Sequence, residues 1–121
     1  MVNILIIDDS PTEVYKLTTI LEKNNYSVQV ASSGEEGLKM AQITRPDLIL
    51  MDVVMPGVNG FQATRQLSRN AVTKDIPVVI VSTKDQDTDK VWGMRQGARA
   101  YLVKPVAESQ LLKAVSDALA D

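Results

Sequence analysis

The sequence of 121 residues contains no cysteine and no histidine. The lack of cysteine excludes disulfides, thiol chemistry and cysteine-rich metal sites, and the lack of histidine removes the commonest zinc ligand and general base. Any chemistry must therefore rely on oxygen ligands and on lysine. Aromatic residues make up only 4% of the chain, and Trp92 is the single tryptophan.

An excess of positive charge and a long apolar run are also missing. The 13 basic and 15 acidic residues give a formal net charge of -2, which leaves no surplus to neutralise a phosphate backbone, so we expect no direct binding of nucleic acid. No apolar stretch approaches the roughly 20 residues of a membrane helix. The start, Met1-Val2-Asn3, lacks the basic leader of a signal peptide. We therefore expect a cytoplasmic protein without membrane insertion.

The chain alternates between short apolar runs and longer amphipathic segments. This alternation is typical of strand–helix units around a buried parallel sheet, and the length suits a single domain over residues 1–121. The expected strands cover residues 3–7, 28–31, 48–51, 78–81 and 101–103, the second being a candidate edge strand. The expected helices cover residues 12–24, 35–43, 60–70, 88–96 and 108–119. Right-handed crossovers place helices on both faces, so the predicted fold is a doubly wound, five-stranded parallel α/β sheet with five helices.

Several helix ends carry recognisable signals. Ser10 and Pro11, followed by Glu13, resemble a capping box with proline at the first helical position, where its missing N–H is not needed. Gly97 is suited to a left-handed helix terminator, and the proline after Arg45 prevents the second helix from continuing much further.

Polar residues follow the expected strands, at the edge of the sheet where ligands bind in this fold class. In chain order they are Asp8 and Asp9, Asp52, Ser82 and Thr83, and Lys104. Three neighbouring carboxylates repel one another unless a cation is bound, and oxygen ligands suit a hard ion such as Mg²⁺. Taken alone, Asp8 could equally be a helix cap, and Lys104 a surface lysine before a turn. Together they indicate a metal-dependent site in which Lys104 reaches across to Asp52.

Four separated stretches resemble the response-regulator receiver family, whose best-known single-domain member is CheY. They are ILIIDDS, LILMDVVMPGVNG, PVVIVST and AYLVKPV, and the match covers essentially the whole chain. The resemblance implies that Asp52 is the phosphoacceptor and that Asp9 and Asp52 are direct ligands of Mg²⁺, for which Mn²⁺ can substitute. It further implies that the Val54 carbonyl is another ligand and that Asp8 acts chiefly through metal-bound water.

The resemblance also implies how the phosphoryl group is held and sensed. Ser82 and Lys104 would bind its oxygens, and the lysine would cancel charge that builds during transfer. Ser82 and Tyr101 resemble coupled switch residues, the tyrosine ring turning into space that opens beneath the fourth helix. The changed surface would be the face of the fourth helix, fifth strand and fifth helix, where a downstream protein would bind.

Trp92 is expected on the fourth helix. Gly93 should lower the stability of that helix by about 1 kcal/mol relative to alanine, unless a close packing contact requires the glycine.

A closer resemblance, to PilH-type regulators of twitching motility, rests on DDSPTEVYKLTTILEK, MPGVNGFQATRQL and STKDQDTDKVWGMRQGARAYLVKP. It implies a histidine kinase of the chemotaxis type as phosphodonor and control of type IV pili as output.

Two residues are expected to flank the path of the water that hydrolyses the acyl phosphate. They are Thr83, which stands where many receivers have alanine or glycine, and the apolar Val54. Thr83 and Val54 predict modest self-dephosphorylation, but ordinary variation in packing explains these two residues equally well.

Two other classes of protein share parts of this pattern. A haloacid-dehalogenase-type phosphatase also uses an aspartate after an apolar strand, but it needs a second aspartate two residues later, where this chain has Val54 and no general acid. A nucleotide-binding domain needs a phosphate-cradling loop after the first strand, where this chain places the negative charges of Asp8 and Asp9. We therefore expect a stand-alone phosphoacceptor switch and not an enzyme, apart from self-phosphorylation by small donors and self-dephosphorylation.

Overall fold

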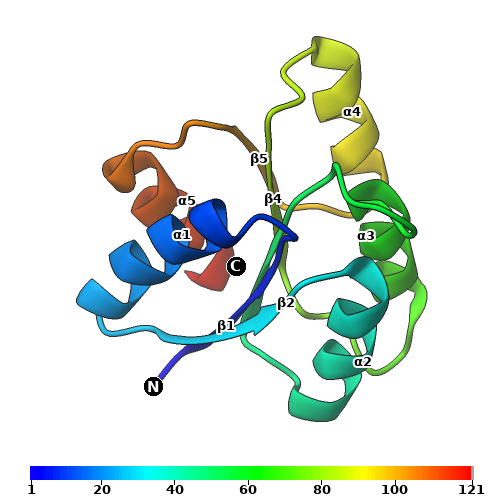
Figure 1. The fold of residues 1–121 in the computed structure, drawn as a ribbon. Helices are drawn as coiled ribbons and strands as arrows, with labels where there is room; N and C mark the ends of the chain where they lie inside the picture. Colours follow the sequence, from blue (N-terminus) through cyan, green and yellow to red (C-terminus); the bar gives the residue numbers. More distant parts are fainter. Residues whose placement is uncertain (121) are drawn as a thin grey trace.

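The computed structural model describes residues 1–120, which form a five-stranded parallel sheet with helices on both faces (Figure 1). The strands are β1 (Asn3–Ile7), β2 (Ser27–Ala31), β3 (Leu48–Met51), β4 (Val78–Ser82) and β5 (Ala100–Val103). The helices are α1 (Pro11–Lys23), α2 (Gly34–Thr44), α3 (Gly60–Arg69), α4 (Asp87–Arg95) and α5 (Glu108–Ala120). Every expected element is present with its ends displaced by at most one residue, which confirms the doubly wound α/β class. Within these residues, no helix is both long and apolar enough to pass through a lipid bilayer.

The strand order is β2-β1-β3-β4-β5, and all neighbouring strands are parallel. The order reverses at β1, which lies between β2 and β3, and folds of this class bind ligands beyond the carboxyl ends of the strands at such a point. β2 pairs only with β1, and of its residues only Ala31 is fully buried. The prediction that this strand lies at an edge is confirmed.

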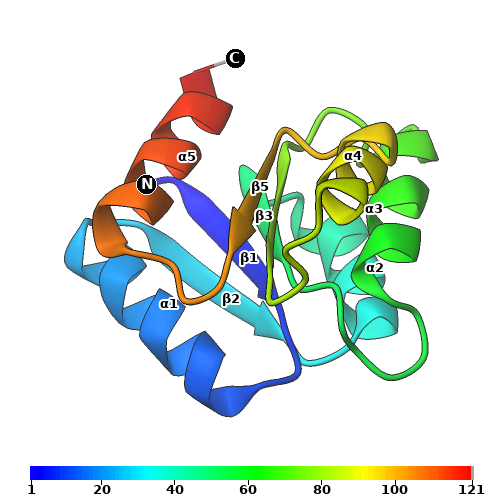
Figure 2. The ribbon, with the colours of Figure 1, turned by 90° about the horizontal axis from the view of Figure 1, so that it is seen from above.

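Two apolar layers hold the helices against the sheet, because successive side chains of a strand point to opposite faces. Ile4 and Ile6 pack in the layer that also contains the apolar residues of α1 and α5, whereas Leu5 and Ile7 pack in the layer beneath α2 and α3. Figure 1 shows α1 and α5 on one side of the sheet and α2, α3 and α4 on the other, and Figure 2 shows the same division from above. The interior is thus apolar, and the polar side chains gather where the strands end.

α1 begins as its sequence predicts, but with a different partner for the cap. The Ser10 hydroxyl accepts a hydrogen bond from the Glu13 N–H at 3.4 Å, and Pro11 is the first helical residue. The expected capping box is only half formed, because the Ser10 N–H donates to the Asp8 carboxylate at 2.9 Å instead of to Glu13. This hydrogen bond ties the start of α1 to the end of β1.

α2 and α4 end where their signals indicate. Arg45 adopts a left-handed conformation with φ 46° directly before the proline. Gly97 has φ 113°, and the N–H groups of Gly97 and Ala98 donate to the carbonyls of Met94 and Gly93. These two hydrogen bonds form the Schellman motif, which explains the glycine at this position.

Candidate functional site

Three of the predicted site residues stand one position after a strand, and their backbones extend the ladders of the sheet. Their N–H groups donate to the last carbonyls of neighbouring strands: Asp8 to Ala31 (3.1 Å), Asp52 to Ile7 (2.9 Å) and Lys104 to Ser82 (2.8 Å). Strand pairing therefore fixes where each of these side chains begins. Residues that are far apart in the sequence meet at one end of the sheet for this reason.

A cluster of three carboxylates lies at this end of the sheet. One oxygen from each of Asp8, Asp9 and Asp52 can be chosen so that all lie within 4.8 Å of one another. Asp8 and Asp52 are 2% and 7% exposed, whereas Asp9 is exposed. Carboxylate oxygens at this separation, with one of them open to solvent, are a donor set that fits a hard divalent cation.

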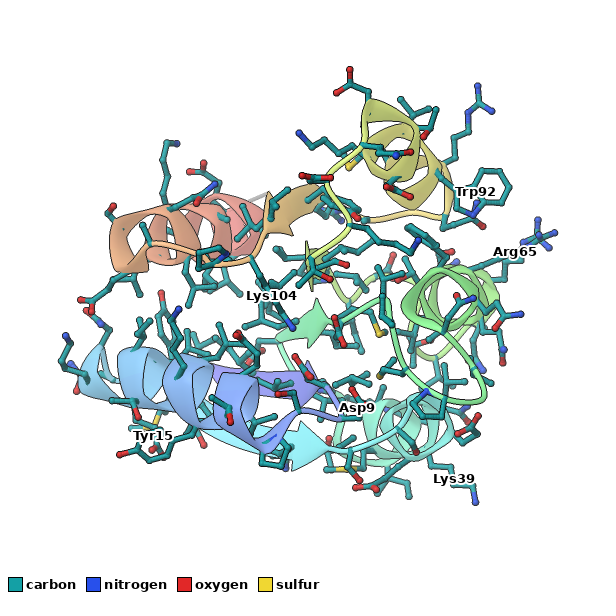
Figure 3. All side chains as sticks on the ribbon, turned by 45° about the horizontal axis from the view of Figure 1, so that its top comes forward. Asp9, Tyr15, Lys39, Arg65, Trp92 and Lys104 are labelled. Carbon is teal, nitrogen blue, oxygen red and sulfur yellow. The ribbon has the colours of Figure 1, made fainter. Side chains whose placement is uncertain are left out.

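Lys104 reaches across the cluster from the end of β5, as predicted. Its ammonium group lies 3.0 Å from an oxygen of Asp8 and 3.4 Å from an oxygen of Asp52, and its side chain is only 8% exposed. Figure 3 shows Lys104 and Asp9 at this end of the sheet. Burial lowers the pKa of Lys104, but the hydrogen bond to Asp8 and the charges of Asp52 and Asp8 outweigh it and raise the pKa above its usual value. The lysine is therefore a permanent positive charge beside two buried carboxylates.

The Asp52 carboxyl group ionises less readily than an exposed aspartate. Burial, followed by the negative charge of Asp8, raises its pKa from 3.8 to about 6, although Lys104 acts in the opposite direction. Asp52 is thus ionised at neutral pH, but poorly solvated. A carboxylate in this state gains from any further positive charge placed beside it.

Ser82 is linked to Tyr101 through the backbone of Lys84. The buried Ser82 hydroxyl accepts a hydrogen bond from the Lys84 N–H at 3.1 Å, and the Lys84 carbonyl accepts one from the Tyr101 hydroxyl at 2.8 Å. The Lys84 ammonium group lies 4.0 Å from Asp89 in the first turn of α4. A displacement of the Ser82 hydroxyl would therefore alter the contacts of Lys84, whose side chain lies beside the first turn of α4.

Gly93 allows the ring of Tyr101 to lie against α4. A Cβ atom at position 93 would come within 2.8 Å of Ile80 and 3.0 Å of the Tyr101 ring. The close packing contact considered for this glycine is therefore real. The contact places the Tyr101 ring against α4, and a second position of the ring stays a prediction.

The loop between β3 and α3 packs closely against the backbone at Asp52. Gly57 has φ 75°, as a glycine in this turn allows, and a Cβ atom at Gly60 would overlap the Asp52 carbonyl oxygen. The Val58 N–H donates to the Glu35 carboxylate at 2.8 Å, a contact that lowers the pKa of Glu35. Sequence reasoning missed Glu35, because nothing in the local pattern of α2 indicates a partner in this loop.

Val54 and Thr83, which we expect to flank the path of the hydrolytic water, are both open to solvent. Val54 is 56% exposed after β3, and Thr83 is exposed after β4. β3 and β4 are neighbours in the sheet, so both residues stand at the same end as Asp52.

An apolar hollow opens beside the carboxylates, between α1 and β2. It has a volume of about 500 Å³, and its lining residues are Asp8, Asp9, Pro11, Val14, Tyr15, Thr18, Val30 and Ser32. Tyr15 is 75% exposed and Val30 is 40% exposed. The site is thus bordered by an apolar surface that solvent can reach.

Comparisons with known proteins agree with this geometry. A sequence profile of the response regulator receiver domain matches residues 4–116. The chain is 61% identical over 120 residues to protein PilH of Pseudomonas aeruginosa, covering 99% of each, and 38% identical over 106 residues to the transcriptional regulatory protein AfsQ1 of Streptomyces coelicolor, covering 88% of this chain but only 46% of AfsQ1. The structure of the Vibrio cholerae chemotaxis protein CheY4 superimposes with a TM-score of 0.91 at 31% identity, covering 98% of each chain. The chain belongs to the response regulator receiver family.

Proposed function

We propose that the chain is a stand-alone response regulator whose receiver domain spans residues 1–121 and accepts a phosphoryl group on Asp52. The observation that carries this proposal is a buried carboxylate with a raised pKa, placed beside two further carboxylates and ion-paired with Lys104. Nothing in this arrangement favours the haloacid-dehalogenase-type phosphatase, since Val54 supplies no general acid.

Mg²⁺ is the proposed cofactor, and Mn²⁺ is expected to substitute for it. Asp9, Asp52 and the Val54 carbonyl would hold the ion directly. Both Asp8 oxygens already have partners, the Ser10 N–H and Lys104, which supports a role through a metal-bound water. When bound, the ion supplies positive charge beside the oxygens of the transferring group.

The transfer step uses groups that this chain provides. An Asp52 oxygen forms a bond to phosphorus in line with the departing nitrogen of a phosphohistidine, and the leaving imidazole takes up a proton. Lys104 and the Ser82 hydroxyl would bind oxygens of the phosphoryl group, and the lysine would offset the charge that develops on them. The protein thus mainly positions and neutralises, and the acyl phosphate is the product.

The output is a changed protein-binding surface. If Ser82 turns toward the phosphoryl group, its hydrogen bond with Lys84 must adjust, and Lys84 is bound to Tyr101 and paired with Asp89 of α4. Such a linkage can convert a local change into a second packing of α4. The downstream partner would bind the face formed by α4, β5 and α5.

The phosphodonor is proposed to be a histidine kinase of the chemotaxis type, and the output control of type IV pili, by likeness to PilH. The reaction would take place in the cytoplasm. The apolar hollow beside Asp9, with Tyr15 at its border, supports a protein donor because it offers a contact surface next to the site. Val54 and Thr83, which offer the hydrolytic water a narrow and poorly oriented path, favour modest self-dephosphorylation.

Phosphotransfer tests this proposal. A purified kinase of the chemotaxis type, carrying labelled phosphate on histidine, should pass the label to this protein but not to the Asp52→Asn variant. Tyr15→Ala should slow transfer from the kinase while leaving labelling by a small acyl phosphate unchanged, because only the protein donor contacts the hollow. Undiminished transfer to Asp52→Asn would contradict the proposal.

A further inference from the structure

A second hollow lies between α3 and α4, outside the carboxylate cluster. It has a volume of about 260 Å³, and its lining residues are Asn59, Phe61, Gln62, Arg65, Trp92 and Gln96. Trp92 is on α4 as expected, and it is 47% exposed although it is the largest side chain of the protein. It faces the α3 side of its helix, and Figure 3 shows it at the same edge of the molecule as Arg65. Trp92 therefore reports on this hollow and not on the face formed by α4, β5 and α5.

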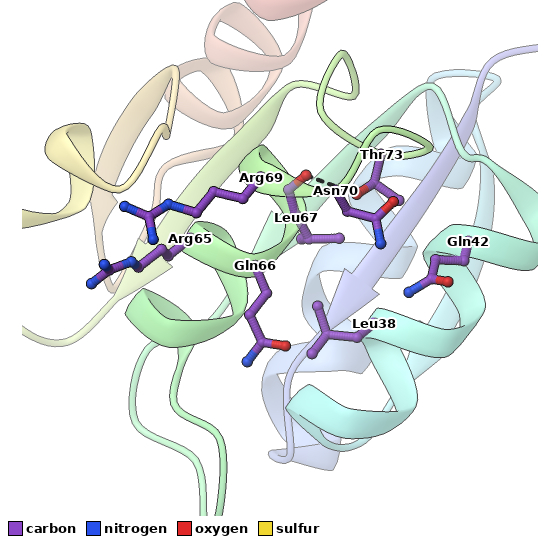
Figure 4. Close-up of a pocket in the computed structure, with 8 residues that line it drawn as sticks. All are labelled: Leu38, Gln42, Arg65, Gln66, Leu67, Arg69, Asn70 and Thr73. Carbon is purple, nitrogen blue, oxygen red and sulfur yellow. Dashed lines mark hydrogen bonds between the residues drawn. The ribbon is translucent and has the colours of Figure 1, made fainter.

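The exposed charges beside the hollow are mainly basic, because Asp89, which lies three residues before Trp92, is only 20% exposed and is paired with Lys84. α3 contains no acidic residue, and its Arg65 and Arg69 lie one turn apart on an exposed side. Figure 4 is a close-up of a separate hollow between α2 and α3, which Arg65 and Arg69 also line, and it shows both guanidinium groups extending away from α2, toward the side on which α4 lies. The exposed Arg95 stands three residues after Trp92 and so shares its side of α4. Across residues 1–120, none of these three arginines forms an ion pair.

The two walls of the hollow differ in how firmly they are held. α3 begins at Gly60, which packs so closely on the Asp52 carbonyl that no side chain fits there. α4 instead rests on the Tyr101 ring through Gly93 and is linked through Lys84 to Ser82. α3, which carries Arg65 and Arg69 and packs against Asp52, thus faces Trp92 on α4, the helix whose packing is proposed to change on phosphorylation.

We propose that Arg65, Arg69, Arg95 and Trp92, the α3–α4 surface, dock an acidic segment of a partner protein whose apolar side chain enters the hollow. Unpaired guanidinium groups complement carboxylates, and tryptophan and arginine are the residue types that contribute most at protein interfaces. The basic patch is local, because the whole chain has a net charge of -2, and this favours a protein segment over nucleic acid. Docking does not require phosphorylation, but its regulation through α4 rests on the proposed function.

The test uses the full chain and a short synthetic peptide of Glu and Ala with one central Phe. Fluorescence anisotropy of the labelled peptide measures affinity, and the emission of Trp92, the only tryptophan, reports contact at the hollow. We expect saturable binding with a change in Trp92 emission. Arg65→Glu combined with Arg69→Glu should weaken binding about tenfold or more. These side chains are exposed, and circular dichroism would verify that the variant is folded.

The matched control combines Lys16→Glu with Lys39→Glu, the same change of charge at exposed positions on α1 and α2 that form no ion pair within residues 1–120, and it should alter the affinity by less than about twofold. A peptide with Ala in place of Phe should bind about tenfold more weakly. Equal losses in the two double variants, no effect of the Phe, or equally tight binding of single-stranded DNA would overturn the proposal. Acetyl phosphate with Mg²⁺ should change the affinity of the wild type but not of Asp52→Asn. If the peptide binds but acetyl phosphate does not change its affinity, the docking proposal stands and the proposed regulation through α4 is contradicted.

Discussion

Replacing Asp52 with asparagine should stabilise the metal-free protein. The pKa of Asp52 rises from 3.8 to about 6 on folding, through burial and the charge of Asp8 and despite Lys104. Each pKa unit corresponds to about 1.4 kcal/mol, so the ionised carboxylate destabilises the fold by about 3 kcal/mol at neutral pH. Asparagine has nearly the same shape and no charge, and Lys104 keeps its contact with Asp8 at 3.0 Å. The variant should therefore recover most of this free energy.

The effect depends on pH in a defined direction. Because the folded-state pKa of this acid is raised, the stability linked to its protonated form is fully present below 3.8 and is lost as the pH rises through about 6. The advantage of Asp52→Asn is therefore greatest at neutral pH, falls to about half at pH 5, and nearly disappears below about pH 4.

Urea unfolding followed by Trp92 emission, with a chelator present, measures these differences. Asp75→Asn is a suitable control, since Asp75 is exposed and the change should alter stability by less than about 0.5 kcal/mol. A destabilising charge on Asp52 is refuted if Asp52→Asn is no more stable than the wild type at pH 7, or if its advantage grows as the pH falls.

Further variants test three separate parts of the structure. Asp9→Ala should remove most of the rise in melting temperature that Mg²⁺ produces, and a full rise in the Asp8→Ala, Asp9→Ala double variant would exclude this cluster as the metal site. Gly60→Ala should lower the free energy of unfolding by about 3 kcal/mol, because its Cβ would overlap the Asp52 carbonyl; urea midpoints equal to the wild type would contradict this contact. The emission of Trp92 should change with an acyl phosphate and Mg²⁺ together but with neither alone. Ser82→Ala should still be labelled while this emission change is muted, and a complete optical response would refute coupling through the hydroxyl.

The elements and the site could be predicted from the sequence for related physical reasons. Buried parallel strands give continuous apolar runs, such as Leu48–Met51, that stand out from amphipathic helices. The residues after such strands must meet at one edge of the sheet, which is why Asp8, Asp52 and Lys104 could be grouped before any distance was known. Burial of the strands accounts for the first result, and their parallel pairing accounts for the second.

Other features depend on loops and on side-chain directions that no periodic pattern specifies. Lys104 lies closer to Asp8 than to the expected Asp52, because strand pairing sets where its side chain begins but not the direction that the side chain takes. The side of α4 on which Trp92 lies could not be predicted, since Val91 and Met94 are also about half exposed and the helix has no clear apolar face. The position of Tyr101 depends on Gly93, which a sequence shows only as a helix-weakening residue.

We propose that Asp52 accepts the phosphoryl group in a reaction that needs a divalent cation. Incubation with acetyl phosphate and Mg²⁺, reduction of the acyl phosphate, and mapping of the modified residue by mass spectrometry test it most directly. We expect one modification, at Asp52, which is absent with a chelator and absent in Asp52→Asn. Modification at Asp8 or Asp9, or labelling of Asp52 that persists without a divalent cation, would contradict it.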